Sequence, residues 1–127
     1  MENQQNDKNF GDHELRWEKD RLNRLMEGFR KPLERVEVYP SPQEINAFYG
    51  EGFKVRKEPV TCMVYIFENQ RQHKEAREQI KKYQDANLKE VMTSSNGRLF
   101  FWGYITENDT NAIYTLNDLA GTFAGEE

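Results

Sequence analysis

Hydrophobic residues recur along the chain with two different spacings, and each spacing predicts a different kind of element. Apolar positions about three to four residues apart form the inner stripe of an amphipathic helix, whereas alternating or continuously apolar runs of roughly four to eight residues are typical of strands. The pattern predicts helices over residues 13–30, 70–86 and 109–123, and strands over residues 35–39, 60–67, 88–93 and 99–105.

Local capping signals place several helix ends. Asp12 suits the N-cap of the first helix, and Pro32 ends that helix because the residue before a proline avoids the helical region. The stretch "SPQE" at 41–44 combines a serine cap, a proline at the first helical position and a capping-box glutamate. It predicts a short helix that closes at the glycines of "YGEGF", followed by an extended edge segment over residues 53–59.

The stretch "NGRLFFWGYI" begins with a tight-turn dipeptide, Asn96-Gly97, which tolerates the positive φ angles of a type I′ turn. We therefore expect residues 88–93 and 98–105 to pair as an antiparallel hairpin around it. From residue 60 onward the predicted order is strand, helix, strand, strand, helix. This order matches most of a ferredoxin-like, split βαβ layout.

The predicted fold is therefore α+β: a two-layer sandwich with an antiparallel sheet and an extra N-terminal helix. The fourth strand of the layout is assigned to residues 35–39, beside the apolar and hence central strand 60–67. Residues 1–12 are predicted to form a flexible polar tail, and residues 13–127 one domain, the natural count for a chain of 127 residues.

Alternation along the two most apolar strands separates an aliphatic face from an aromatic one. The aliphatic sets suit the layer beneath helices 70–86 and 109–123. An aromatic set on the other face is too large to stay in contact with water, and three covers are possible: the helix 13–30, a second copy of the chain, or a ligand. The apolar stripe of the helix 13–30 favours the first, so we expect this helix to pack on the aromatic face. In the last case the sheet face is a binding surface formed by Tyr65, Phe67, Phe100, Trp102 and Tyr104.

Charge and composition exclude some partners. The net charge of −4 disfavours broad electrostatic binding to nucleic acid. The apolar run Val60 to Phe67 is far too short to span a bilayer. Cys62 is the only cysteine, so no disulfide forms within the chain.

No catalytic residue, metal site or cofactor site is predicted. Cys62 falls in the middle of a strand on its aliphatic face, where a cysteine behaves as a small hydrophobe. His73 lies near the inner stripe of helix 70–86, which favours a packing role over a catalytic one. His13 has no partner at a zinc-ligand spacing, and "ENDTN" at 107–111 lacks the spacing of a calcium loop.

Three stretches, "PVTCMVYIFENQRQHKEAREQI", "NGRLFFWGYI" and "LNDLAGTFAGEE", resemble small secreted lipoproteins of Gram-positive bacteria. The resemblance covers residues 60–127. It implies a compact α+β domain on a polar tether, to which "ENQQNDKN" would correspond, and it carries over no catalytic residue. The chain departs from that pattern because it has no lipobox and no N-terminal cysteine.

These observations favour a small non-enzymatic domain that binds a protein partner or forms a homodimer. The alternative is a small-molecule carrier or a small enzyme with a pocket at the aromatic sheet face. If Met1 is the native start the expected location is cytoplasmic, whereas a chain trimmed after an export signal would be lipid-anchored outside the membrane.

Overall fold

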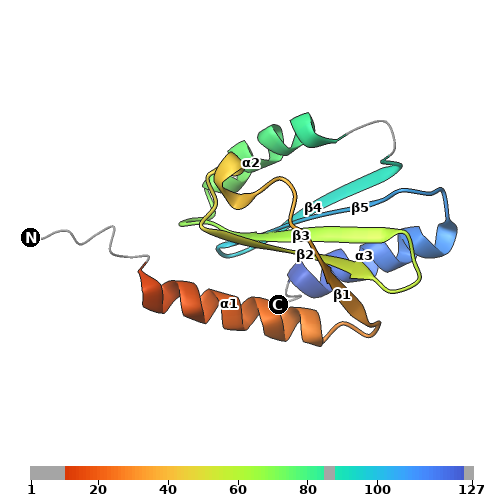
Figure 1. Ribbon diagram of the computed structural model, residues 1–127, viewed down its shortest axis with the longest axis horizontal. Helices are drawn as coiled ribbons and strands as arrows, with labels where there is room; N and C mark the ends of the chain where they lie inside the picture. The colour runs from red at the N-terminus through yellow and green to blue at the C-terminus, as the bar shows by residue number, and fades with distance from the viewer. Residues whose placement is uncertain (1–10, 85–87, 125–127) are drawn as a thin grey trace, which may run out of the picture.

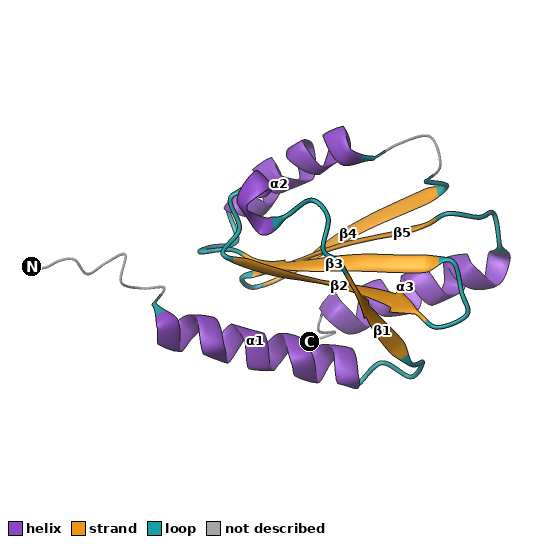
Figure 2. Cartoon of the chain, viewed as in Figure 1, coloured by secondary structure: helices purple, strands orange, loops and turns teal. Residues whose placement is uncertain are grey.

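The computed structural model describes residues 11–84 and 88–124, and it contains an antiparallel sheet with helices on both faces (Figures 1 and 2). The α+β class and the antiparallel sheet are confirmed. The elements are α1 (Asp12–Glu27), β1 (Leu33–Val36), the 3-10 helix η2 (Pro42–Ile45), β2 (Tyr49–Val55), β3 (Val60–Ile66), α2 (Gln72–Ile80), the 3-10 turn η3 (Lys81–Tyr83), β4 (Glu90–Asn96), β5 (Leu99–Ile105) and α3 (Thr110–Ala124).

The five strands lie in the order β1-β2-β3-β5-β4, and each neighbouring pair is antiparallel. Strand β3 is central, as its apolar sequence predicts. The prediction that residues 35–39 lie beside β3 is wrong, because β2 occupies that place and β1 pairs with β2 instead.

The source of that error is the glycine pair in "YGEGF", which resembles the end of a helix when only the sequence is considered. Both glycines lie inside β2. A Cβ atom at Gly52 would lie 2.8 Å from the carbonyl oxygen of Val36 and 2.9 Å from the sulfur of Met63. Glycine is required there by the close approach of neighbouring strands rather than by a helix end.

The β4–β5 hairpin is confirmed, with Asn96 opposite Leu99 as its last pair. The two residues of the loop are therefore Gly97 and Arg98, one position later than predicted. Gly97 has a φ of 59°, and among the described non-glycine residues only Asn46 and Lys57 have positive φ. A positive φ at the first loop residue alone matches a type II′ turn rather than type I′.

One face of the sheet carries the aliphatic core and is covered by α1 and α3. The inner stripe of α3 is buried as predicted, and Leu116 packs closely over Gly103, where an added Cβ would lie 2.8 Å from Leu116 Cδ1. Helix α1 lies on the same face and contributes Leu22 and Met26 to this core, and Phe29 joins it just after the helix ends. The prediction that α1 covers the aromatic face is wrong.

The aromatic face is covered within the chain, by α2 and η2. Ile45, Ala76 and Ile80 pack there against the rings of β3 and β5. Helices α2 and α3 therefore lie on opposite faces, which corrects the prediction of a shared face. Strands β3 and β4 are both antiparallel to β5, so they run parallel to each other, and α2 connects them. Connections between parallel strands are right-handed, and this handedness determines the face of the sheet on which α2 lies. No strand follows α3 in the described chain, so this rule does not determine the face on which α3 lies.

Capping at the helix N-termini differs slightly from the predictions. Gly11 is the N-cap of α1, so Asp12 belongs to its first turn, and Glu14 Oε1 accepts the Gly11 N–H at 3.0 Å. The 41–44 capping box is confirmed, with Ser41 N–H donating to Glu44 at 2.9 Å. Residues 1–10 of the predicted tail lie outside the described residues. None of the helices in the described ranges is long and apolar enough to cross a membrane.

Candidate functional site

The structure places most of the predicted aromatic binding face in the core. Tyr104 is partly buried and packs against the same cluster. The other rings have almost no surface available to a ligand, because Tyr65 and Phe100 are 0% exposed and Phe67 and Trp102 are 1% exposed. The Tyr65 hydroxyl donates to the Pro40 carbonyl at 2.7 Å, so its polar end is also used internally.

Cys62 and His73 are both interior residues. Cys62 is fully buried in the aliphatic core, where burial raises the pKa of its thiol. His73 is 1% exposed, stacks edge-on against Phe67 and lies 2.8 Å from Ser95 Oγ through Nδ1. Burial lowers the pKa of His73 from 6.5 to about 4, so the ring is neutral at physiological pH. A packing role agrees with this geometry for both residues.

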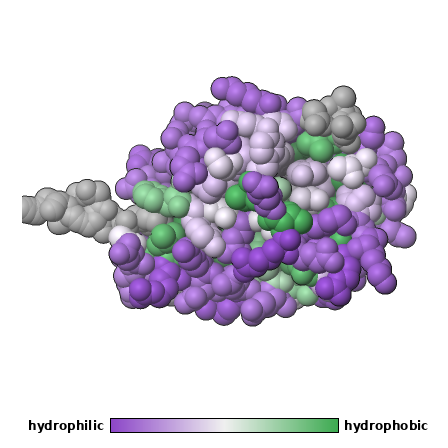
Figure 3. Space-filling view, in the orientation of Figure 1, coloured by the Kyte–Doolittle hydropathy of each residue, from purple (hydrophilic) through white to green (hydrophobic). Residues whose placement is uncertain are grey.

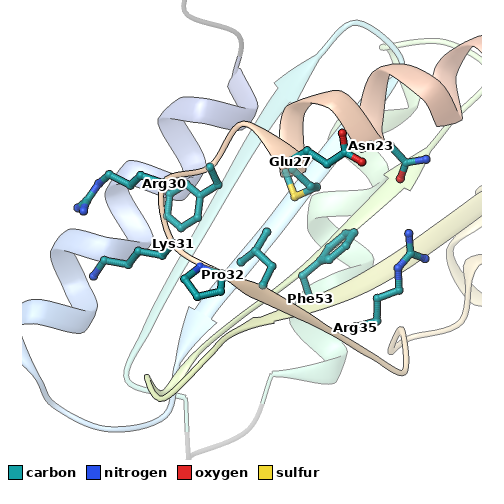
Figure 4. Close-up of a pocket in the computed structure, with 10 residues that line it drawn as sticks. Asn23, Glu27, Arg30, Lys31, Pro32, Arg35 and Phe53 are labelled. Atoms are coloured by element: carbon teal, nitrogen blue, oxygen red, sulfur yellow. The ribbon is translucent and has the colours of Figure 1, made fainter.

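A pocket of about 360 Å³ opens where the C-terminal end of α1 meets β1 and β2 (Figure 4). That volume lies at the lower end of the range of small-ligand sites, roughly 300–1,000 Å³. Its walls come from α1, from the connection to β1, and from the α1-facing sides of the two strands. The lining residues are Asn23, Met26, Glu27, Phe29, Arg30, Lys31, Pro32, Leu33, Arg35 and Phe53.

The floor of this pocket, which we call the α1/β1 pocket, is apolar. Met26 ends the buried stripe of α1 and Phe29 follows the helix, and they are 5% and 8% exposed. Phe53 is 5% exposed and lies on β2 directly opposite Arg35, and Leu33 lies on the same face two residues earlier in β1. Side chains of alternate residues share a face of a strand, so both strands present apolar groups to α1 at this point.

The rim is polar and carries both charges. Asn23 and Glu27 come from α1, and Arg35 extends from β1 toward the helix (Figure 4). Arg35 lies 5.6 Å above the centre of the Phe53 ring, and its Nη1 pairs with Glu51 at 3.0 Å. The Arg35 side chain is 63% exposed, so it covers part of the apolar floor while remaining open to solvent.

Arg30 and Lys31 point away from the pocket toward α3 (Figure 4). Arg30 pairs with Asp118 at 2.6 Å, and Lys31 donates to Glu58 at 2.6 Å and to Thr115 at 2.8 Å. Burial alone would raise the pKa of Glu58, but the hydrogen bond and charge of Lys31 lower it on balance. These contacts fix the connection between α1 and β1, and with it one wall of the pocket.

A polar cluster continues the same face along β2. The Tyr49 hydroxyl donates to Glu51, the carboxylate that also pairs with Arg35. Burial, followed by the hydrogen bond and charge of Glu51, raises the pKa of Tyr49 to about 12. Lys19 of α1 lies 4.2 Å from the centre of the Tyr49 ring. Arg35 is therefore held in place from the side away from the pocket.

Sequence reasoning missed this site. Its residues come from the stretch 23–35, which the pattern divides among a helix end, an irregular connection and a short strand, and from Phe53 in the predicted edge segment. The pairing of β1 with β2 brings them together, and the sequence did not predict that pairing. The available signal was the alternation of Leu33 and Arg35 just after Pro32, which places two unlike side chains on one face.

Within residues 11–84 and 88–124, no group of three or more His, Cys, Asp or Glu residues is placed to hold a metal ion. The surface seen in Figure 3 is mostly hydrophilic, with hydrophobic areas that are small and separate. Comparison with models of known protein families, with curated proteins and with solved structures finds no match to this chain.

Proposed function

We propose that this protein is a non-enzymatic binding domain that receives an apolar side chain of a protein partner in the α1/β1 pocket. The observation that carries the proposal is the pairing of an apolar floor with a rim that offers an amide, a carboxylate and a guanidinium. A peptide presents the complementary combination, because its side chain can be apolar while its backbone offers N–H and C=O groups.

The size and depth of the pocket support a side chain better than a whole cofactor. Its floor residues are already 5–8% exposed, so an occupant adds to an existing core rather than filling a deep cavity. A leucine-sized group would cover Phe53 and Leu33 while its flanking atoms reach Asn23 and Arg35. Covering apolar surface in this way stabilises a complex by roughly 25 cal/mol per Å² buried.

The alternative of a carrier or enzyme with a pocket at the aromatic sheet face is supported less well. It requires space beside Tyr65 and Trp102, and both rings are covered by α2 and η2. Binding at that face would require α2 to move away from the sheet.

The proposal is tested with two small probes of nearly equal size, N-acetyl-leucine amide and N-acetyl-asparagine amide. Each is titrated into the ¹⁵N,¹³C-labelled protein and followed by NMR. We expect the leucine probe to shift the methyl signals of Met26 and Leu33 with a Kd on the order of millimolar, the affinity typical of a fragment of this size. The asparagine probe should shift them much less.

A matched pair of variants locates the binding. Asn23→Trp places an indole at the rim of the pocket, whereas Arg24→Trp places the same group on the exposed side of α1. The Asn23→Trp variant should lose the response to the leucine probe, and the Arg24→Trp variant should keep it. Equal binding to both variants, or shifts confined to other parts of the protein, would contradict the proposal.

The resemblance of residues 60–127 to secreted lipoproteins stays a prediction, and it bears on where the pocket works. A polar tether before α1 would present the α1/β1 pocket at a cell surface. Sequencing the gene upstream of the Met1 codon tests this prediction, because an apolar run that ends in a cysteine is required for a lipid anchor.

A further inference from the structure

We infer that the partner of this domain enters as an extended strand that pairs antiparallel with the open edge of β1, with an acidic residue opposite Arg35 and an apolar residue opposite Leu33. The inference rests on the proposed function, since the apolar residue is the one that occupies the α1/β1 pocket. It adds the conformation of the partner, its direction and a short sequence pattern.

Strand β1 is the first strand in the sheet order, with β2 as its only neighbour among the described strands. Its other side is an edge of four residues. An edge strand offers N–H and C=O groups that an added strand can satisfy, and this is a recurring mode of peptide recognition.

The alternation of hydrogen bonds between β1 and β2 shows which backbone groups of β1 point toward the open edge. Arg56 N–H donates to the Pro32 carbonyl at 3.1 Å, one step beyond the Leu33–Val55 pair. Bonded and non-bonded pairs alternate along antiparallel strands. Glu34 and Val36 therefore bond to β2, while the N–H and C=O groups of Leu33 and Arg35 point toward the open edge.

The same two residues line the α1/β1 pocket. A residue paired with Leu33 or Arg35 places its side chain on the same face of the sheet, with Cβ atoms roughly 4.5–5.5 Å apart. Main-chain pairing at this edge therefore delivers alternate side chains of the added strand to the pocket and to its rim. The edge and the pocket form one continuous binding surface.

Charge complementarity selects the side chains. Arg35 is 63% exposed and its ion pair with Glu51 engages Nη1, whereas a guanidinium carries five N–H donors. A carboxylate on the added strand opposite Arg35 completes a charge-assisted pair. Leu33, which lines the pocket, favours an apolar side chain at the position opposite it. Because the strands run antiparallel, the partner sequence is acidic–any–apolar from its N-terminus.

The test uses a synthetic peptide, acetyl-Thr-Thr-Glu-Thr-Leu-Thr-Thr-amide, titrated into the ¹⁵N-labelled full chain. We expect downfield shifts of the Leu33 and Arg35 amide protons as they gain hydrogen bonds. N-methylation of the peptide leucine removes a donor that faces β1 and should weaken binding at least tenfold. N-methylation of the threonine between glutamate and leucine removes an outward donor, so that peptide should bind as the parent does.

Replacing the peptide glutamate with glutamine should weaken binding about threefold to tenfold in the native protein but not in Arg35→Ala. A peptide with leucine and glutamate exchanged should bind less tightly than the parent. An equal effect of glutamine in both proteins would overturn the assigned pairing with Arg35.

Failure of this inference is distinguishable from failure of the proposed function. If the leucine N-methylated peptide binds as tightly as the parent and still shifts Met26, strand addition is overturned while the pocket function stands. Strand addition is likewise overturned if N-acetyl-leucine amide binds and the peptide does not. If neither probe shifts the pocket signals, the proposed function fails and the inference fails with it.

If the Leu33 and Arg35 amide shifts grow with protein concentration alone, the edge belongs to a second copy and the inference is overturned.

Discussion

Arg21 on α1 makes two hydrogen bonds to Asn96 at the end of the β4–β5 hairpin, from Nη1 to the side-chain oxygen at 2.7 Å and from Nη2 to the carbonyl oxygen at 2.9 Å. Asn96 Nδ2 in turn donates to the Phe123 carbonyl near the end of α3, at 2.8 Å. One asparagine thus connects α1, the hairpin and α3. Arg21 also pairs with Glu18 at 3.0 Å, a carboxylate that lies in the interior at 4% exposure.

This cluster predicts that α1 is anchored by polar contacts as well as by its apolar stripe. Arg21→Ala should lower the free energy of unfolding by about 2 kcal/mol, because among the described residues it leaves the buried Glu18 paired only with the more distant Arg98, at 3.7 Å. Arg16→Ala on the exposed side of the same helix is the control and should change stability by less than about 0.5 kcal/mol. Equal effects in urea denaturation would show that the cluster does not anchor the helix.

The hairpin turn gives a second prediction. Gly97→Val should destabilise the fold by about 1–3 kcal/mol, since a β-branched residue resists the φ of 59° at this position. Gly28→Ala is the matched control, because Gly28 has an ordinary helical φ of −78°. Thermal unfolding of both variants measures the difference. An unchanged melting temperature for Gly97→Val would contradict the assignment of Gly97 to a turn position with a positive φ.

Stability should fall in mild acid because of His73. Its pKa is about 4 in the folded protein against 6.5 when unperturbed, so the unfolded chain binds more protons between these values. The contribution is fully present above the unfolded pKa and is lost as the pH falls toward the folded value. Linkage predicts a loss of roughly 2 kcal/mol between pH 7 and pH 5.

Urea denaturation across that range measures the slope, and His73→Gln should flatten it. If that variant does not fold, NMR titration of the His73 ring in the native protein gives the pKa directly. A pKa at or above the unperturbed value would refute the prediction.

The Cys62 thiol should react slowly. Its side chain is 0% exposed and burial raises its pKa, so little thiolate forms and reagents reach it only when the core opens. Labelling with a chromogenic disulfide should be slow in the native protein and rapid in denaturant. Rapid native labelling would mean that β3 does not present this residue to the core.

Sequence patterns predicted the elements of this fold better than their arrangement. Periodicity identified the core stripe of α3, the central position of β3 and the antiparallel hairpin, since each of these depends on local spacing. The faces covered by α1 and α2 could not be predicted in the same way. An apolar stripe shows that a helix is covered on one side but does not say by which face of a sheet.

The candidate site escaped prediction for a similar physical reason. Phe53 meets Leu33 and Arg35 only because β1 pairs with β2, and Gly52, which allows the close approach of Val36, also belongs to a stretch that resembles a helix end. The aromatic residues formed the predicted binding face because their combined surface is large. They proved to be the second layer of the core, covered by Ile45, Ala76 and Ile80.

The most direct test of the central claim is an isotope-filtered NOE measurement on the complex of the labelled protein with the unlabelled acidic–any–apolar peptide. We predict NOEs from the peptide leucine methyls to the Leu33 methyls and to the Met26 methyl, because Leu33 is the cross-strand partner of the leucine and Met26 lines the pocket floor. NOEs from those methyls to the rings of Tyr65 or Trp102, with none to Leu33, would contradict the account and return the binding site to the aromatic sheet face.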